Sequence, residues 1–490
     1  MKMKNTFLAA GVALLSLGAL VGCGGSGDDK NTLKIIALNA GYGDSWIKEL
    51  ETKFEASHEG INVEVEAIYN ASQLIQSHLE SSKNPDDLYI SVGAEWKTYA
   101  AQGYFANLDE LLNEEVDGTT VKNKVADEYE GSLYFTKSNG EKHCYRLPWT
   151  SGIGGIYYNK VMFKEHGWDT WLKETYTTNT TGVPETFEQL KALCDKIVDS
   201  KIGVAGDRKT AVKPFAYTGA NTDYFDYTVF DWWAQIVGKD AIKEFLKYEN
   251  ADVYDVAKND TYKALQTATS YWEELFIEHD EEGKPLGESK YVVADSESKT
   301  AEAAQKEFLN GYAAMIFNGD WLYNEIVNYG VTADKFELGL MKTPTIPEAK
   351  AEYANTSYVI GEDQYIAIPA TSNNKELAKE FIKLMISDEG CITFTKNANG
   401  FLAYDCDYSN SGITNSYIND AINIRNSYTT KFTSYSGNRK YLCNYIDIWC
   451  TAGNRPYLAL LNGTRGLTES FATIATTAKG NWADWTNKSK

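Results

Sequence analysis

The stretch "TLKIIALNAGYGDSWIKELETKFEASHEGINVEVEAI", residues 32–68, indicates the fold most directly. Its first seven residues form an apolar run typical of a buried strand, residues 45–58 carry apolar side chains at helical spacing, and residues 61–68 alternate like a second strand. A helical pattern at 72–82 and a strand pattern at 87–92 follow. This βαβαβ order predicts a parallel sheet with helices on its faces, and hence an α/β fold. Ligands of such sheets bind outside the carboxyl ends of the strands, here residues 39–44 and 93–96.

The first of these loops offers a competing interpretation. "GYGDSW", residues 41–46, follows a strand and opens a helix, and Glu66 stands about as far downstream as the acid of a dinucleotide-binding motif. However, Trp46 occupies the position of the third glycine, where its bulk would keep helix and strand from packing closely. We therefore expect no dinucleotide and no other cofactor.

Further outward, the N-terminus has the features of an export signal. Lys2 and Lys4 precede an apolar run over residues 7–21, which is short for a membrane span. The run ends in "LVGC", which resembles a bacterial lipobox, so we expect a signal peptide at 1–22 and a lipid, such as palmitate, on Cys23. An ordinary signal followed by an incidental cysteine is the alternative. The flexible residues 23–32 favour the lipoprotein, because an anchored body needs a tether.

Charge and composition exclude several classes of function. The formal net charge is −21, and residues 1–22 contribute two lysines and no acid, so the body without them is more acidic still. An acidic surface makes nucleic acid an unsuitable partner and leaves the lipid as the contact with the membrane. The sequence holds no CxxC, HExxH or GxSxG motif, so we expect neither a metal site nor an enzyme. Cys443 and Cys450 are close enough in sequence to bridge, although free buried thiols fit equally well.

The middle of the chain predicts more helices and one further strand. Thr186, with Gln189 three residues later, is a capping box for a helix over "ETFEQLKALCDKIV". A helix ending "EFLNG" leads to the strand "YAAMIF", and "NGDW" then turns into another helix. In "SNNKELAKEFIKLMISDEG", residues 372–390, an asparagine cap and a glycine stop predict a single helix.

Together, these segments resemble the extracellular solute-binding lipoproteins of bacterial ABC sugar importers. The resemblance rests on the lipobox and on "GINVEVE", "NPDDLYISVGAEWKTYAAQGYFANLDELL", "LPWTSGIGGIYYNKVMFKEHGW", "PETFEQL", "FLNGYAAMIFNGDWL" and "IPATSNNKELAKEFIKLMISDEG", in that order. It implies two α/β lobes joined by a hinge of crossing segments: an N-lobe of 33–148 plus 364–402 and a C-lobe of 149–362 plus 404–490. It also implies a monomer, on the outer face of the membrane or in the periplasm, that passes an oligosaccharide to permease subunits.

A sugar site needs aromatic platforms for the apolar faces of the rings and carboxylates for the hydroxyl groups. The chain has 12 Trp and 33 Tyr, and several aromatic residues stand beside acids at predicted strand ends or turns. From these and from the resemblance we expect ligand contacts at Tyr42, Asp44, Glu95, Trp96, Trp149, Ser151, Trp232, Asp320, Trp321 and Trp449. For each tryptophan the alternative is core packing, and Asp44 and Asp320 could instead cap helices.

Two other functions remain open on the sequence alone. The same fold could bind iron, a polyamine or another small solute, with fewer stacking aromatic residues and, for iron, clustered ligands. A surface-anchored glycoside hydrolase would need two carboxylates at a fixed separation, and no motif singles out such a pair in so acidic a chain.

Overall fold

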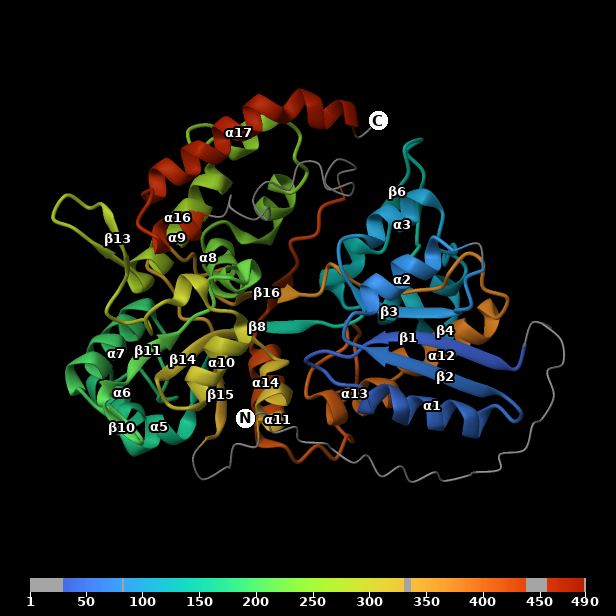
Figure 1. The fold of residues 1–490 in the computed structure, drawn as a ribbon, viewed down its shortest axis with the longest axis horizontal. Coiled ribbons are helices and arrows are strands. Elements are labelled where there is room, and N and C mark those ends of the chain that lie inside the picture. Colours follow the sequence, from blue (N-terminus) through green and yellow to red (C-terminus); the bar gives the residue numbers. More distant parts are fainter. Residues whose placement is uncertain (1–29, 82, 330–335, 438–455, 489–490) are drawn as a thin grey trace, which may run out of the picture.

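The computed structural model describes residues 30–81, 83–329, 336–437 and 456–488. The expected signal peptide, Cys23, most of the tether, Cys443, Cys450 and Trp449 lie outside these residues. Two α/β lobes stand side by side with β8 (Gly152–Asn159) running between them (Figure 1). The predicted α/β class and two-lobed architecture are confirmed.

The N-lobe contains a four-stranded sheet in the order β17–β3–β1–β2. Strands β1 (Thr32–Leu38), β2 (Asn62–Ile68) and β3 (Leu88–Val92) are parallel, as the βαβαβ pattern predicts, and β17 (Gln364–Ala367) joins β3 antiparallel. The helices of this lobe are α1 (Ser45–Ser57), α2 (Ala71–Leu79), α3 (Trp96–Gln102), α4 (Val121–Lys124), α12 (Lys375–Ile386) and α13 (Asp388–Ala398). Figure 1 shows the late helices α12 and α13, in orange, beside the early α1, in blue.

The C-lobe sheet is built around β8. Its order is β11–β14–β8–β16–β18, with β15 also paired to β8. The strands are β11 (Lys213–Ala216), β14 (Ala313–Gly319), β15 (Leu338–Met341), β16 (Thr356–Ile360) and β18 (Thr430–Phe432). The described helices are α5 (Lys160–Glu165), α6 (Trp168–Thr175), α7 (Phe187–Ser200), α8 (Asp226–Phe245), α9 (Asp260–Phe276), α10 (Ala301–Leu309), α11 (Leu322–Asn328), α14 (Ser416–Ser427), α16 (Pro456–Leu461) and α17 (Leu467–Lys488).

Small β pairs and 3₁₀ turns complete the described elements. The pairs are β4 (Glu115–Val116) with β5 (Thr119–Thr120), β6 (Phe135–Thr136) with β7 (Lys142–His143), β9 (Gly203–Val204) with β10 (Asp207–Ala211), and β12 (Ile277–His279) with β13 (Pro285–Glu288). The 3₁₀ turns are η1 (Leu111–Asn113), η2 (Asp127–Ser132), η3 (Thr222–Phe225), η4 (Ala251–Tyr254) and η5 (Ser296–Ser298).

Three segments of the described chain cross between the lobes, side by side. Residues 147–152 lead from the N-lobe into β8, residues 360–364 join β16 to β17, and residues 399–404 leave α13. Bridges between Leu147 and Ile366 and between Thr150 and Leu402 hold these segments together. The N-lobe sheet therefore includes a strand from the second of the two ranges expected for it.

Two helix predictions met different outcomes. Thr186 caps α7 by accepting a hydrogen bond from the backbone N–H of Gln189, as predicted. The single helix expected over 372–390 is instead two, because Ser387 adopts an extended conformation and its side chain caps α13 at Gly390. Gly390 thus lies inside α13 instead of ending a helix. No helix among the described residues is both long and apolar enough to cross a membrane.

Candidate ligand-binding cleft

The loop after β1 meets the C-lobe at the carboxyl end of the N-lobe sheet. Gly43 holds a positive φ of 66°, which a glycine adopts without strain, and the turn presents Tyr42 toward the other lobe. A Cβ added at Gly41 would lie 2.7 Å from Cβ of Trp321, so the backbone of this loop lies directly against the C-lobe. This close approach fixes where the two lobes meet.

A hydrogen bond joins the lobes at this point. The Tyr42 hydroxyl donates to Oδ1 of Asp320, at 2.7 Å, and Asp320 is fully buried. Burial raises the pKa of Asp320 to about 7, against the opposing effects of the Tyr42 hydroxyl and the backbone of Ile153. Burial, together with the nearby Asp320 carboxylate, raises the pKa of Tyr42. The second oxygen of Asp320, Oδ2, has no hydrogen-bond partner within the described part of the chain.

Trp321 forms an aromatic wall next to this hydrogen bond. It precedes α11, is partly exposed and packs against the hydrophobic cores of both lobes. The edges or faces of three tyrosine rings surround it, with centroid distances of 6.4 Å to Tyr42, 5.7 Å to Tyr227 and 6.3 Å to Tyr224. The site therefore gathers aromatic rings from the N-lobe, from η3 and α8, and from the loop between β14 and α11.

Glycines at the start of β8 make room for these side chains. A Cβ at Gly152 would lie 3.3 Å from Oδ1 of Asp320 and 3.4 Å from the Tyr42 hydroxyl. A Cβ at Gly154 would lie 2.6 Å from Cβ of Tyr227, closer than two such carbons approach. The glycine-rich segment of residues 152–155 is thus the surface on which the cleft side chains rest.

Asp44 and Glu95 follow β1 and β3 at the carboxyl end of the N-lobe sheet. Asp44 occupies the N-cap position of α1 without capping it, and its carboxylate pairs with Lys48 at 2.6 Å. Glu95 is exposed at the start of α3, next to Gly93, whose positive φ of 135° turns the chain away from β3. Both carboxylates remain within reach of solvent.

Three of the tryptophans expected to contact ligand are buried in the cores of the lobes. Trp149 is 2% exposed and packs on Trp46 at a centroid distance of 5.8 Å, although its ring also meets Tyr42. Trp96 is buried beneath Arg146, whose guanidinium lies 4.6 Å from the ring centroid. Trp232 is buried inside the C-lobe.

Trp232 is buried by neighbours that other elements of the C-lobe supply. The indole N–H of Trp232 donates to the backbone oxygen of Pro344, and its ring packs against Phe187 and Tyr271, so nothing of it faces the cleft. Ser151 is also buried, and its hydroxyl donates to Glu128 at 3.5 Å. Asp320 does not cap α11, since its carboxylate is engaged by Tyr42.

Sequence reasoning missed three tyrosines of the cleft. Tyr69 directly follows β2, at the carboxyl end of the N-lobe sheet, and is 82% exposed. Tyr224 and Tyr227 come from a helical segment without a motif. The rule that pointed to Tyr42 after β1 applies equally to Tyr69 after β2 and could have identified it.

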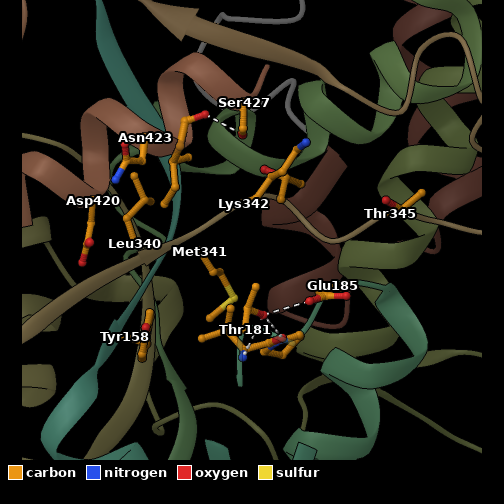
Figure 2. A pocket seen from close by; sticks show the side chains of 14 residues that line it. Tyr158, Thr181, Glu185, Leu340, Met341, Lys342, Thr345, Asp420, Asn423 and Ser427 are labelled. Atoms are coloured by element: carbon orange, nitrogen blue, oxygen red, sulfur yellow. Dashed lines mark hydrogen bonds between the residues drawn. The ribbon is translucent and has the colours of Figure 1, made fainter. Parts of the chain in front are cut away.

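Two cavities of the described chain are lined by other residues than Tyr42, Asp320 and Trp321. One of about 580 Å³ lies wholly in the C-lobe, where Figure 2 shows Met341 pointing toward the loop that carries Thr181. It includes none of the predicted ligand contacts. Another, also about 580 Å³, lies between the lobes, with Glu128 and Ser132 on one side and Lys243 and Lys247 on the other. No group of three or more metal-ligating side chains comes together in the described chain.

Two lobes, three crossing segments and an aromatic face between the lobes define a protein that encloses a solute. A family model described as "Bacterial extracellular solute-binding protein" matches residues 38–390, and the chain belongs to this family. It is 23% identical over 400 residues to the diacetylchitobiose binding protein DasA of Streptomyces coelicolor, with 79% of each chain covered. It is 29% identical over 161 residues to the multiple sugar-binding protein of Streptococcus mutans, with 32% of each covered.

Solved structures share the fold. A chitin oligosaccharide binding protein aligns with a TM-score of 0.60 at 18% identity, over 92% of this chain and 99% of that one. The solute-binding protein RafE in complex with raffinose aligns with a TM-score of 0.61 at 17% identity, over 91% and 99%. Both span the two lobes, so the fold of the whole described body is that of these receptors.

Proposed function

We propose that the chain is a carbohydrate-binding receptor, without catalytic activity, that encloses an oligosaccharide between its lobes and delivers it to an ABC permease. The observation that carries the proposal is the wall of rings around Trp321 beside the unpartnered Oδ2 of Asp320. Aromatic rings cover the apolar faces of sugars, and a desolvated carboxylate oxygen accepts from a hydroxyl group. The printed names of the relatives, which specify diacetylchitobiose, multiple sugars, chitin oligosaccharides and raffinose, support a sugar ligand.

The proposed site extends from the floor of the cleft to its mouth. Trp321 and Asp320 form the floor, and Tyr69 offers an exposed ring at the end of the neighbouring strand. Tyr42, Tyr224 and Tyr227 lie between them, with Asp44 and Glu95 at the rim. The proposed site does not include the buried Trp96, Trp149, Ser151 and Trp232. Such a row of aromatic rings and carboxylates suits several linked sugar units better than a single small ion or an amine.

Closure of the cleft is part of the proposal. Tyr42 and Asp320 meet across the lobes, and Arg425 of α14 pairs with Glu128 of η2 at 3.2 Å, so this structure has its lobes together. Rotation about the three crossing segments would open the face that carries Trp321 to a ligand. We further propose that a lipid on Cys23 holds this body, as a monomer, at the outer face of the membrane.

Calorimetry of the purified body against a panel of chito-, xylo-, malto- and raffinose-type oligosaccharides tests the proposal. We expect one class to bind and to raise the unfolding temperature, since a ligand that binds only the folded state stabilises it. Trp321→Ala should lose that binding, while Trp171→Ala, which removes a half-buried indole of α6, should retain it. Binding of iron or a polyamine with no response to any sugar, or cleavage of a panel member during incubation, would contradict the proposal.

A further inference from the structure

Two cysteines that are distant in the sequence meet in the N-lobe. Cys391 lies in the first turn of α13, and Cys406 follows the third crossing segment. The Cys406 thiol donates to the backbone oxygen of Asp388, at 3.8 Å, and the Cys391 thiol donates to that of Ile386, at 3.6 Å. Asp388, whose backbone oxygen accepts from Cys406, and Cys391 are three residues apart in the first turn of α13. The thiols of Cys391 and Cys406 therefore both lie at this turn.

Backbone contacts hold the two segments in this register. The Asp405 N–H donates to the oxygen of Lys124 at 2.8 Å, and the Asp407 N–H donates to Oδ1 of Asp388 at 3.4 Å. Lys124 closes the arrangement by pairing with the same carboxylate at 2.5 Å. Cys406 is therefore fixed on both sides, against the start of α13.

The two cysteines belong to the same core cluster of the N-lobe and differ in exposure. Cys391 is buried in the N-lobe core, and Cys406, which packs against that core, is partly exposed. The neighbouring Cys406 thiol, followed by burial, raises the pKa of Cys391. Cys144 and Cys194, the other described cysteines, are buried in different lobes and cannot pair with each other.

We propose that Cys391 and Cys406 form a disulfide that ties α13 to the third crossing segment. In the step we envisage, the accessible Cys406 thiolate attacks an external disulfide, of a thiol oxidase or of oxidised glutathione, and one thiol leaves. Cys391 then gives up its proton and attacks Sγ of Cys406, so the second thiol leaves and the protein bond forms. Two protons and two electrons pass from the cysteine pair to the external disulfide, which is reduced to two thiols.

The proposed disulfide constrains one of the crossing segments of the hinge and makes no contact with the ligand. Residues 401–404 run beside residues 148–151, since the Ala403 N–H donates to Trp149 and Tyr404 donates to Pro148. A covalent tie at Cys406 fixes the end of this crossing segment to the N-lobe, before the chain continues to α14. The inference does not depend on which solute the cleft binds, and exported proteins are the class in which such bonds persist.

Peptide mapping of the purified chain tests the proposal. The protein is incubated with oxidised glutathione, free thiols are alkylated without reduction, and the digest is analysed by mass spectrometry. We expect one linked peptide pair containing Cys391 and Cys406, and a rise of about 3 °C in the unfolding temperature over the reduced protein. Both cysteines found alkylated, or either joined to another cysteine, would overturn the proposal.

Two matched variants test whether the rise in unfolding temperature on oxidation comes from Cys406. In Cys406→Ser the shift between oxidised and reduced protein should vanish, whereas Cys194→Ser, which replaces a buried thiol of the C-lobe, should keep it. A shift that survives Cys406→Ser would assign the effect to other thiols and contradict the inference. The peptide map of the unaltered chain decides the question even if a variant fails to fold.

Discussion

Trp321 is the residue on which both lobes converge. It packs against both hydrophobic cores, yet part of its ring remains exposed, and the backbone of the loop at Gly41 closes over it. A side chain in this position is covered by the opposite lobe in the closed state and uncovered in the open one. Its contribution should therefore appear in binding more than in folding.

Replacing Trp321 by alanine should weaken oligosaccharide binding by about 1–3 kcal/mol, because the ring that stacks on the sugar is lost. The unfolding midpoint should change little, because a partly exposed side chain leaves no sealed cavity. Calorimetry and denaturant titration of the same sample measure the two effects. Equal losses in affinity for Trp321→Ala and the control Trp171→Ala would speak against a platform.

Trp149→Ala should behave in the opposite way. The ring is sealed in the N-lobe between Trp46, Phe394 and Tyr42, so truncation should cost roughly 3–5 kcal/mol of unfolding free energy. Denaturant unfolding measures this loss, and Trp149→Phe, which keeps most of the packing, should recover part of it. An unchanged midpoint with lost affinity would instead return Trp149 to the ligand site.

The sequence could identify aromatic residues beside acids but could not say which of them face the cleft. Tyr42, Asp320 and Trp321 were expected from strand ends and turns, and the structure brings them together. Trp96 and Trp232 have the same local signature but are buried. Burial of a tryptophan depends on neighbours such as Arg146 and Phe187, which come from other elements and leave no mark on the local pattern.

At the scale of elements, β8 is the strand on which the site is built. It pairs with β14, β15 and β16 and leads directly out of the first crossing segment. Its glycines let α8 approach so closely that Tyr227 lies on the backbone of Gly154. The distance between β8 and α8 thereby sets the position of the tyrosines around Trp321.

Gly154→Ala should move α8 away from β8, because the new Cβ would lie 2.6 Å from Cβ of Tyr227. We expect a loss of about 1–3 kcal/mol in unfolding free energy from overpacking, together with weaker ligand binding as Tyr227 is displaced. Chemical denaturation and calorimetry measure both. Gly480→Ala is the control for a surface glycine, since Gly480 is exposed on α17, its φ is not positive, and a Cβ there meets no atom within 4 Å. Unaltered ligand affinity in Gly154→Ala would show that the site does not depend on the packing of α8 against β8.

Patterns within an element were predicted well, and breaks between elements were not. The order of β1, α1, β2, α2 and β3 followed from periodicity, because each has a distinct apolar spacing. The break between α12 and α13 was missed, because the polar residues 387–390 resemble the end of a helix with a glycine stop, whereas the Ser387 side chain caps the start of a second helix. The pairing of β17 with β3 spans most of the chain and has no local signal.

For the whole molecule, the contact between the lobes contains a carboxyl group that titrates near neutrality. Asp320 has a pKa of about 7 in this closed structure and should return toward its ordinary value once solvent reaches it. The closed state thus binds the proton more tightly. The stability that this proton gives the closed state over the open state is complete below the ordinary pKa of an aspartate, and it is lost as the pH rises through about 7.

The ligand-free protein should accordingly be more closed at pH 5 than at pH 8, by about 2–3 kcal/mol from this group. The radius of gyration from small-angle scattering should increase with pH over that interval. Asp320→Asn keeps an oxygen that can accept from Tyr42 but removes the titrating group, so the change of the radius of gyration with pH should become smaller. Asp231→Asn is the matched control, because burial in the C-lobe also raises the pKa of Asp231 to about 7. A radius independent of pH in the unaltered protein would refute the expectation.

The three crossings also decide when the protein can fold. A chain emerges from the ribosome or a secretion channel with its N-terminus first, and compact units usually form as they appear. Here the N-lobe lacks β17, α12 and α13 until residue 398 has emerged, so its first strands wait for the chain that builds most of the other lobe. Such a delay keeps the early polypeptide unfolded for most of its passage, which is the state that threading through a narrow channel requires.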